Sequence, residues 1–514
     1  MPTIRTILAG ISPMSDVTTD GQYDSAIAID PDFPIADTGA NAVRPSGALR
    51  PVAYAKFSST ECNGNPYWIT TSPKTSLVYT YLSSGKFNSY SSGLGSETNI
   101  GTPTSGAGNG MAYYNNYIYL ATPTNISRYG PLDGSASLSN TVWTGSTLGS
   151  QTALVNTTYP SIRGSGTVPN HPMHVHVDNK LYFGDVVNGQ GVIHFIKTTK
   201  VTDQGDTNSG STYNALDLPF GFLPMDIESY GNDLAILAVQ TTNATLDQGK
   251  AVLFLWDTTS DTFYEQIPLP DTFGTALLNV NGGLYYWGGN FTATGGHSLY
   301  QYLGGRTVKL LAPIPEGHPP LAGAVDAVGS KIVWGSFQTY PTNSACVWAF
   351  GSKTGQSGLH NIAKATASAS STDGLVTALA FSEQRSLAMP GLLIGWRDAG
   401  AFGIDSLSTT YQTHYWRKRF SVGRPFRIKR VRFPLGAAVA SNMTLVPTWY
   451  VDDLSSNTAG TTINTTNYAA SERYIEQYPG VTGKNDFTLQ LVWSGTALLP
   501  VKLPIEIDVE YISQ

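Results

Sequence analysis

Four of the eight histidines lie close together in the sequence, at His171, His174, His176 and His194. Because His174 and His176 are two residues apart, they share one face of a predicted strand. A metal ion could contact both there, with His194 from the next strand as a third ligand. No cysteine or paired carboxylate stands nearby to complete a ligand set. We therefore interpret these histidines as packing or surface residues and predict no metal site.

Sequence motifs of two common enzyme classes are absent. The chain contains neither a G-x-S-x-G nucleophile turn nor a G-x-x-x-x-G-K-[ST] phosphate loop. A glycosidase needs only two well-placed carboxylates, so a pair brought together from different parts of the fold stays open. We predict that the protein is not an enzyme, and that it has no catalytic residues and no cofactor.

A cluster of basic residues near the C-terminus holds 8 of the 30 Lys and Arg residues within 16 positions. Aromatic residues lie between them, so the cluster could contact nucleic acid by phosphate neutralisation and stacking. It could equally meet an acidic surface of the same or a neighbouring subunit. We predict intramolecular packing or an assembly interface, formed by Arg417, Lys418, Arg419, Arg424, Arg427, Lys429, Arg430 and Arg432.

Strict alternation within this cluster places charge on both faces of one predicted strand. Arg427 and Lys429 fall on one face with Val431, whereas Ile428 falls on the other face together with Arg430 and Arg432. Neither face is then apolar. This pattern favours a sheet edge or a subunit contact over a core position.

The elements that position these residues follow from a hairpin pattern that recurs along the chain. An apolar run, a small or polar turn and a run rich in Tyr, Leu, Ile or Trp follow one another, as in NVNGGLYYWGG at 279–289. Successive turns are 48 to 63 residues apart, the length of a four-stranded propeller blade plus a loop. The pattern predicts a seven-bladed β-propeller. Clear turns lie at Asn115, Asp178, Gly231, Asn281 and Gly329, and weaker copies at Gly64 and Glu383.

The chain divides into three predicted regions. Residues 1–50 contain Asp-Gly, Asp-Pro, Phe-Pro and Arg-Pro steps, which predict an extended N-terminal arm. We expect this arm either to lie across its own propeller and close the ring, or to lie on a neighbouring subunit.

Residues 51–411 are predicted to form the propeller. Alternating strands at 424–435, 443–453, 486–495 and 501–512 predict a C-terminal β-sandwich (platform) domain over 412–514. The fold class is all-β.

Composition agrees with strands and tight turns, because only 13% of the residues are charged while Gly (53) and Tyr (28) are abundant. The net charge of −6 is unevenly distributed: 1–411 is acidic and 412–514 is basic.

Cys62 and Cys346 fall in different predicted blades, which favours buried free thiols over a disulfide. No apolar run is long enough for a signal-peptide core or a membrane span. We expect synthesis and use in a cytoplasm.

The order of parts resembles that of phage virion tail proteins, most closely the tail nozzle (tail tubular) proteins of short-tailed phages. The residues that carry the resemblance are GISP at 10–13, Gln22, RPSGALRP at 44–51, WRKRF at 416–420 and FRIKRVRFPLGAAV at 426–439. Those proteins similarly open with a Gly-Gly-Ile-Ser-like segment and an Arg-Pro before the propeller. This chain is shorter, with less room for an inserted platform. Its position in the tail stays open, since a tail-tip or adaptor protein of a long-tailed phage would share these features.

The resemblance implies a non-catalytic structural protein in the virion tail, assembled in the host cytoplasm. Copies of the chain, six by this resemblance, would form a ring that contacts adaptor or fibre proteins, and genomic DNA would pass through it without sequence-specific contact. The alternative is a carbohydrate-binding or glycan-cleaving propeller, such as a receptor-binding tail protein or a kelch-like lectin. Tyr285, Tyr286, Trp287 and Trp334 could then stack on sugars, although at strand positions such residues more often form core.

Overall fold

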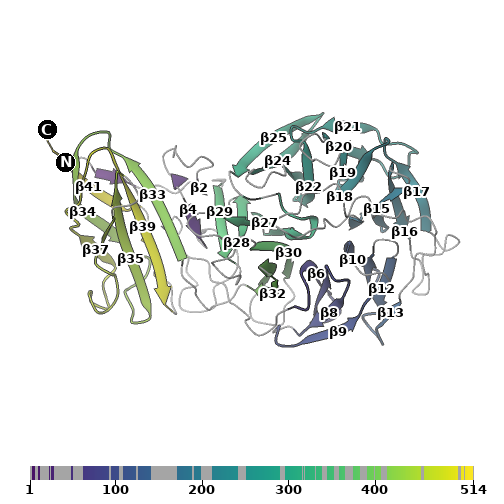
Figure 1. Cartoon of the computed structure of the whole chain (residues 1–514), viewed down its shortest axis with the longest axis horizontal. Helices are drawn as coiled ribbons and strands as arrows, with labels where there is room; N and C mark the ends of the chain where they lie inside the picture. The colour runs from purple at the N-terminus through teal and green to yellow at the C-terminus, as the bar shows by residue number, and fades with distance from the viewer. Residues whose placement is uncertain are drawn as a thin grey trace.

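The chain is an all-β propeller joined to a β-sandwich, as seen in a computed structural model (Figure 1). The propeller occupies the right of the view and the sandwich the left. Among the described residues there is no α-helix, only the 3₁₀ turn η4 (Ala322–Ala324). The structure describes residues 3–5, 10–11, 22–23, 25–27, 48–49, 62–91, 94–103, 108–122, 126–139, 171–187, 190–197, 211–240, 250–289, 296–314, 317, 319–329, 331–338, 344–351, 358–364, 374–382, 391–398, 400–406, 414–452, 457–495, 499, 501–502 and 504–512.

Six four-stranded antiparallel sheets and one three-stranded sheet follow one another along the described part of the propeller. We number them 1 to 7. Sheet 1 contains β6 (Pro66–Thr71), β7 (Val78–Leu82), β8 (Phe87–Tyr90) and β9 (Glu97–Gly101); sheet 2 contains β10 (Gly110–Tyr114), β11 (Tyr117–Ala121), β12 (Ile126–Gly130) and β13 (Ser137–Ser139). Sheet 3 contains β14 (Met173–Val175), β15 (Leu181–Val187), β16 (Gln190–Ile196) and β17 (Ser211–Asp217); sheet 4 contains β18 (Phe222–Tyr230), β19 (Asp233–Gln240), β20 (Lys250–Trp256) and β21 (Glu265–Pro268). Sheet 5 contains β22 (Phe273–Val280), β23 (Gly283–Gly289), β24 (His297–Gly304) and β25 (Thr307–Ile314). Sheet 6 contains β26 (Val325–Val328), β27 (Lys331–Gln338), β28 (Ser344–Gly351) and β29 (Gly358–Lys364); sheet 7 contains β30 (Leu375–Ser382), β31 (Gly391–Asp398) and β32 (Ala401–Ser406).

The five clear turns of the sequence pattern each join the first two strands of a sheet, as predicted. Their backbone explains the residues found there. Asn281 and Gly282 have φ values of 52° and 82°, the left-handed conformation that a two-residue hairpin turn requires and that Asn and Gly tolerate. Of the two weaker copies, Gly64 lies directly before β6, and the chain before Cys62 that would complete its hairpin lies outside the described residues, so this copy stays a prediction. Glu383 lies outside the described residues.

The first and last sheets of the propeller are bonded to each other. Cys62, just before β6, donates its backbone N–H to the carbonyl of Phe402 on β32 (2.9 Å). The hydroxyl of Thr377 on β30 lies 2.8 Å from Oδ1 of Asn65 and 2.7 Å from the carbonyl oxygen of Pro66. Apolar side chains of both sheets form one buried cluster around these bonds. Residues about 310 positions apart therefore close the ring.

Two sheets packed face to face form the sandwich. One has the order β1 (Thr3–Arg5), β41 (Glu506–Tyr511), β34 (Phe426–Pro434) and β37 (Tyr474–Gln477), with β38 (Thr482–Gly483) also on β34. The other has the order β36 (Asn457–Ala459), β35 (Met443–Val451), β39 (Asp486–Gly495), β33 (His414–Ser421) and β4 (Ser25–Ile27). Inward-facing apolar residues of both sheets share one core.

The N-terminal arm belongs to the sandwich in its described strands. β1 pairs with β41 and β4 pairs with β33, so the arm supplies an edge strand to each sandwich sheet. β5 (Ala48–Leu49) pairs with β40 (Val501–Lys502), and β2 (Gly10–Ile11) pairs in parallel with β3 (Gln22–Tyr23). The expectation that the arm closes the propeller ring is therefore wrong for these strands, because β1, β4 and β5 pair with sandwich strands, β2 pairs with β3, and the ring is closed by Cys62 and Thr377.

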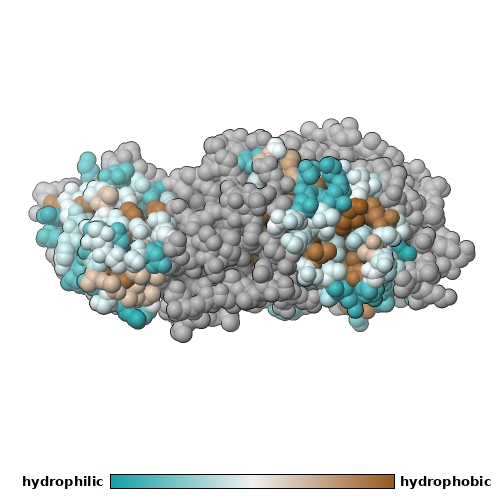
Figure 2. Space-filling view, turned by 90° about the horizontal axis from the view of Figure 1, so that it is seen from below, coloured by the Kyte–Doolittle hydropathy of each residue, from teal (hydrophilic) through white to brown (hydrophobic). Residues whose placement is uncertain are grey.

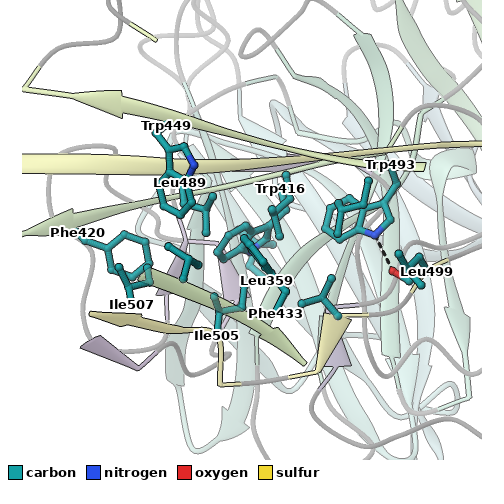
Figure 3. Close-up of a cluster of buried hydrophobic side chains, with 14 of the residues drawn as sticks. Leu359, Trp416, Phe420, Phe433, Trp449, Leu489, Trp493, Leu499, Ile505 and Ile507 are labelled. Carbon is teal, nitrogen blue, oxygen red and sulfur yellow. Dashed lines mark hydrogen bonds between the residues drawn. The ribbon is translucent and has the colours of Figure 1, made fainter. Parts of the chain in front are cut away.

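The propeller and the sandwich share a hydrophobic contact. Leu359 of β29 lies in the same buried cluster as Trp416 and Phe433 of the sandwich (Figure 3). In that view the indole N–H of Trp493 donates to the carbonyl of Leu499 (2.8 Å), which satisfies a polar group inside the core. The arm strands β2 and β4 also contact β29. Sheet 6 is thus the part of the propeller on which the arm and sandwich rest.

Cys62 and Cys346 are both buried and free, which confirms the prediction from their spacing. Burial raises the pKa of the Cys62 thiol to about 12, so it stays protonated at neutral pH. The hydroxyl of Tyr90 donates to its Sγ (3.1 Å). These thiols act as small core residues.

Replacing Thr377 by Val tests the closure of the ring. The substitution keeps the shape but removes the hydroxyl that contacts Asn65 and Pro66, so we expect a loss of about 1–3 kcal/mol in the free energy of unfolding. Thr275→Val is the matched control, because Thr275, like Thr377, is buried on the first strand of its sheet. Its hydroxyl has no hydrogen-bond partner among the described residues. Thermal unfolding of both variants gives the comparison. Equal midpoints would contradict a closing role for Thr377.

Candidate functional site

The eight predicted basic residues lie in the sandwich but do not form a single patch. Arg417, Lys418 and Arg419 belong to β33 in one sheet, whereas Arg427, Lys429, Arg430 and Arg432 belong to β34 in the other. Arg417 and Lys418 are buried, at 5% and 7% exposure, and Arg417 stacks on the ring of Tyr450. Arg419 is half-exposed and pairs with Asp486 (2.6 Å). The part of the cluster on β33 is therefore engaged within the domain.

The prediction that neither face of β34 is apolar is wrong. The register against β41 shifts between Ile428 and Arg430, which marks a β-bulge. One extra residue in the strand changes the alternation, so that Ile428 and Val431 both point inward and are fully buried. The basic side chains are left on the opposite face. β34 is consequently an internal strand of its sheet, with one core face and one charged face.

Carboxylates on the neighbouring strands neutralise much of this charged face. Arg432 pairs with Glu506, Asp508 (3.0 Å) and Glu476 (3.4 Å). Arg430 shares two of these partners, at 2.8 Å from Asp508 and 3.5 Å from Glu476. Because β41 and β37 flank β34 on either side, the carboxylates lie beside the guanidinium groups by register. These ion pairs, which we call the charge ladder, hold β37, β34 and β41 together through their side chains.

Three basic residues remain closer to solvent. Arg424 is exposed and stacks on the ring of Tyr511, with its Cζ 3.2 Å from the ring centroid. Arg427 is exposed, and among the described residues it forms no ion pair. Lys429 pairs with Glu510 (2.9 Å), and the two side chains are 36% and 42% exposed. These residues, with the exposed Tyr474 and Tyr478 of the β37 edge, are the part of the cluster available to a partner.

The four clustered histidines separate into two pairs. His171 and His194 lie on either side of the buried Asp185, at 3.7 and 3.3 Å. His174 and His176 reach across to Ser229 of sheet 4. Within the described residues, no group of three or more His, Cys, Asp or Glu side chains is placed to hold a metal ion. The pair around Asp185 connects segments of sheet 3, and the pair at Ser229 connects sheet 3 to sheet 4.

Two aspartates on the first strands of their sheets connect neighbouring sheets, Asp226 buried and Asp326 partly buried, and sequence reasoning did not single them out. Asp226 of β18 accepts the backbone N–H of Leu277 on β22 (2.7 Å) as well as that of Ile227. Asp326 of β26 accepts from Phe381 on β30 in the same way. Burial raises the pKa of Asp226 to about 7 and that of Asp326 to about 6, although the backbone donors oppose the shift. Both carboxylate oxygens of Asp226 and of Asp326 already accept hydrogen bonds from backbone N–H groups. These bonds within the fold therefore engage both aspartates.

The aromatic residues considered for sugar stacking lie inside the propeller. Tyr286, Trp287 and Trp334 have no exposed surface. Trp334 donates its indole N–H to His297 of the preceding sheet (2.9 Å), and Tyr286 stacks on Tyr300 at 4.8 Å. Tyr285 is partly buried against the same core. The expectation that these residues are mostly core is confirmed.

The charge ladder predicts unequal effects of two similar substitutions. Arg432→Gln removes the group that three carboxylates share and leaves the largely buried Asp508 with fewer counter-charges, so we expect a clear fall in the thermal midpoint. Lys429→Gln breaks only an exposed pair, and its midpoint should stay close to that of the unmodified protein. Calorimetry of both variants checks this. Equal losses would show that the ladder does not stabilise the sandwich.

No protein-family model matches this chain, and no curated protein matches it. Solved structures with a similar fold include the computationally designed Ika8 protein, at 11% identity and a TM-score of 0.39, covering 68% of this chain and 97% of that one. They also include the WD40 domain of Neurospora crassa Pan2, at 11% identity and a TM-score of 0.40, covering 68% of this chain and 91% of that one.

Proposed function

We propose that this protein is a non-catalytic structural component of a phage tail, a nozzle or adaptor-proximal ring that forms part of the genome-ejection channel. The observation that supports this most is the order of parts: an N-terminal arm, a propeller, and a sandwich into which the arm inserts an edge strand on each sheet. That order is the one on which the resemblance to tail nozzle proteins rests. The arm and the sandwich together would be the platform of the subunit.

The interior of the propeller suits a mechanical role. Its inner-strand carboxylates Asp226 and Asp326 hold neighbouring sheets together through backbone donors, and its large aromatic residues fill the core. A closed ring of sheets bonded in this way resists deformation. Copies of the chain arranged in a ring would give the channel a net negative surface, which repels DNA and lets it slide without sequence-specific contact.

The partners in this proposal are further copies of the chain and other tail proteins such as adaptor or fibres. Figure 2 shows one side of the molecule, on which the described sandwich surface is largely hydrophilic or neutral while hydrophobic residues gather on the propeller. The exposed basic and tyrosine residues of the sandwich would give a polar contact between subunits. In the described part of the chain, no helix is long and apolar enough to cross a membrane.

Charge reversal at the accessible basic residues tests the assembly surface. Arg427→Glu combined with Lys429→Glu leaves Arg430 and Arg432 with their internal partners, so the sandwich should fold while subunit assembly is reduced. Lys309→Glu on the exposed face of β25 is the control, and it should assemble normally. Sedimentation measures the assembly and circular dichroism the fold. Full assembly of a folded double variant would remove this surface from the proposal.

The proposal as a whole is tested by locating the protein. We expect it to co-sediment with intact viral particles from its source, and labelled antibody should mark a single tail vertex in electron micrographs. Absence from particles would overturn the tail role. Specific binding or cleavage of host surface glycans by the purified protein would then favour the carbohydrate-binding alternative.

A further inference from the structure

A chain of four side chains joins the inner strand of sheet 3 to that of sheet 4. In the first half of the chain, Nε2 of His176 lies 3.0 Å from the carbonyl oxygen of Asn232, and its Nδ1 lies 2.9 Å from Oγ of Ser229. In the second half, the same Oγ lies 2.7 Å from Nε2 of His174, which is 3.3 Å from Oε1 of Glu228. The side chains of His174 and Glu228 are 21% and 17% exposed, so solvent protons can reach them.

The chemistry of these groups fixes the direction of the hydrogen bonds. A carbonyl oxygen only accepts, so Nε2 of His176 carries a hydrogen. In the neutral ring Nδ1 is then an acceptor, and the Ser229 hydroxyl donates to it. The Ser229 oxygen in turn accepts from the Nε2–H of His174. With both rings neutral every bond in the chain is satisfied, and His174 presents the same N–H to Glu228.

Several titratable or charged groups from the surrounding elements face this chain. Asp226 precedes Glu228 on β18 by two positions, and both it and Asp326 of β26 raise the pKa of Glu228 through their negative charge. On the β14–β15 hairpin, Asp178 lies near His176 and pairs with Lys180 (2.9 Å), and the Tyr182 ring contacts the His176 ring edge-on. From β22, Asn279 donates its side-chain N–H to the Ser229 carbonyl (2.6 Å). The negative groups beside Glu228 thus outnumber the positive ones.

We infer that His174 and Glu228 form a proton-operated joint between sheets 3 and 4, closed while the pair holds one shared proton and loosened when alkaline pH removes it. An ionised Glu228, whose side chain is only 17% exposed, would be a further negative charge beside Asp226 and Asp326. The joint rests on these contacts and on the charges around them, and does not depend on the tail role proposed above.

The direction of the pH effect follows from the same surroundings. Burial raises the pKa of Glu228 from 4.5 to about 8, while burial lowers the pKa of His174 from 6.5 to about 4. The pair therefore keeps one proton between these limits. Because the pKa of Glu228 is raised on folding, its stabilising contribution is complete below its ordinary pKa and is lost as the pH rises through about 8. Asp226 and Asp326 contribute in the same direction as the pH rises through about 7 and about 6.

The variant Glu228→Gln tests the joint, because its neutral amide cannot ionise but keeps an acceptor oxygen for His174 and for the backbone N–H of Ser229, which lies 2.9 Å from Oε1 of Glu228. We expect it to match the unmodified full-length protein in thermal midpoint near pH 6 and to melt at a higher temperature near pH 9. Ser229→Ala, which interrupts the chain, should melt lower at every pH. Asp261→Asn, an exposed carboxylate in the loop between β20 and β21 of sheet 4, is the matched control and should follow the unmodified protein throughout. Parallel pH profiles for Glu228→Gln and the unmodified protein would overturn the inference.

Hydrogen exchange locates the effect within the fold and needs no variant. After correction for the intrinsic pH dependence of exchange, peptides covering β14 and β18 should lose protection between pH 6 and pH 9, while peptides covering β7 and β8 of sheet 1 keep theirs. Equal loss of protection in all sheets would show general destabilisation and contradict a local joint. Unchanged protection in β14 and β18 would also contradict it.

Discussion

Cohesion between sheets is the constraint on which the rest of this structure depends. The strand ladders described for the propeller each run within one sheet, so the ladders themselves do not hold one sheet to the next. The contacts that do so are apolar faces and a few directed polar groups on the inner strands, such as Asp226 toward Leu277 and Thr377 toward Asn65. These groups are buried, and leaving one unpaired costs far more than the bond contributes. Their positions therefore fix how neighbouring sheets are set against each other.

The same need for paired edges explains where the N-terminal arm lies. An open sandwich sheet presents a row of unpaired N–H and C=O groups at each edge. β1 covers the edge of β41 and β4 covers the edge of β33, although some 390 residues or more separate each pair in sequence. The arm thus ties the start of the chain to its end. Since β2 and β4 also contact β29, it ties the sandwich to sheet 6 of the propeller as well.

Sequence reasoning succeeded where a local rule decides the structure. Asn281-Gly282 and Gly231 mark hairpin turns because few residues adopt positive φ there, and the run of such turns is enough to predict a propeller. It failed where one inserted residue changes the outcome. The bulge after Ile428 reverses the alternation of β34, and no residue type signals it. The partners of the arm, and the meeting of His174 with Glu228, arise from long-range packing that spacing in the sequence does not encode.

The bulge in β34 also determines what the basic cluster can do. If the strand alternated without interruption, Ile428 and Val431 would fall on opposite faces, and charged groups would have to enter the core at great cost. With the bulge, Arg430 and Arg432 share one outer face with the carboxylates of β41 and β37, which satisfy them within the domain. A partner that needs free positive charge would have to compete with those carboxylates. Residues such as Arg427, without a carboxylate partner in the described sandwich, are therefore the ones through which this surface can act on another molecule.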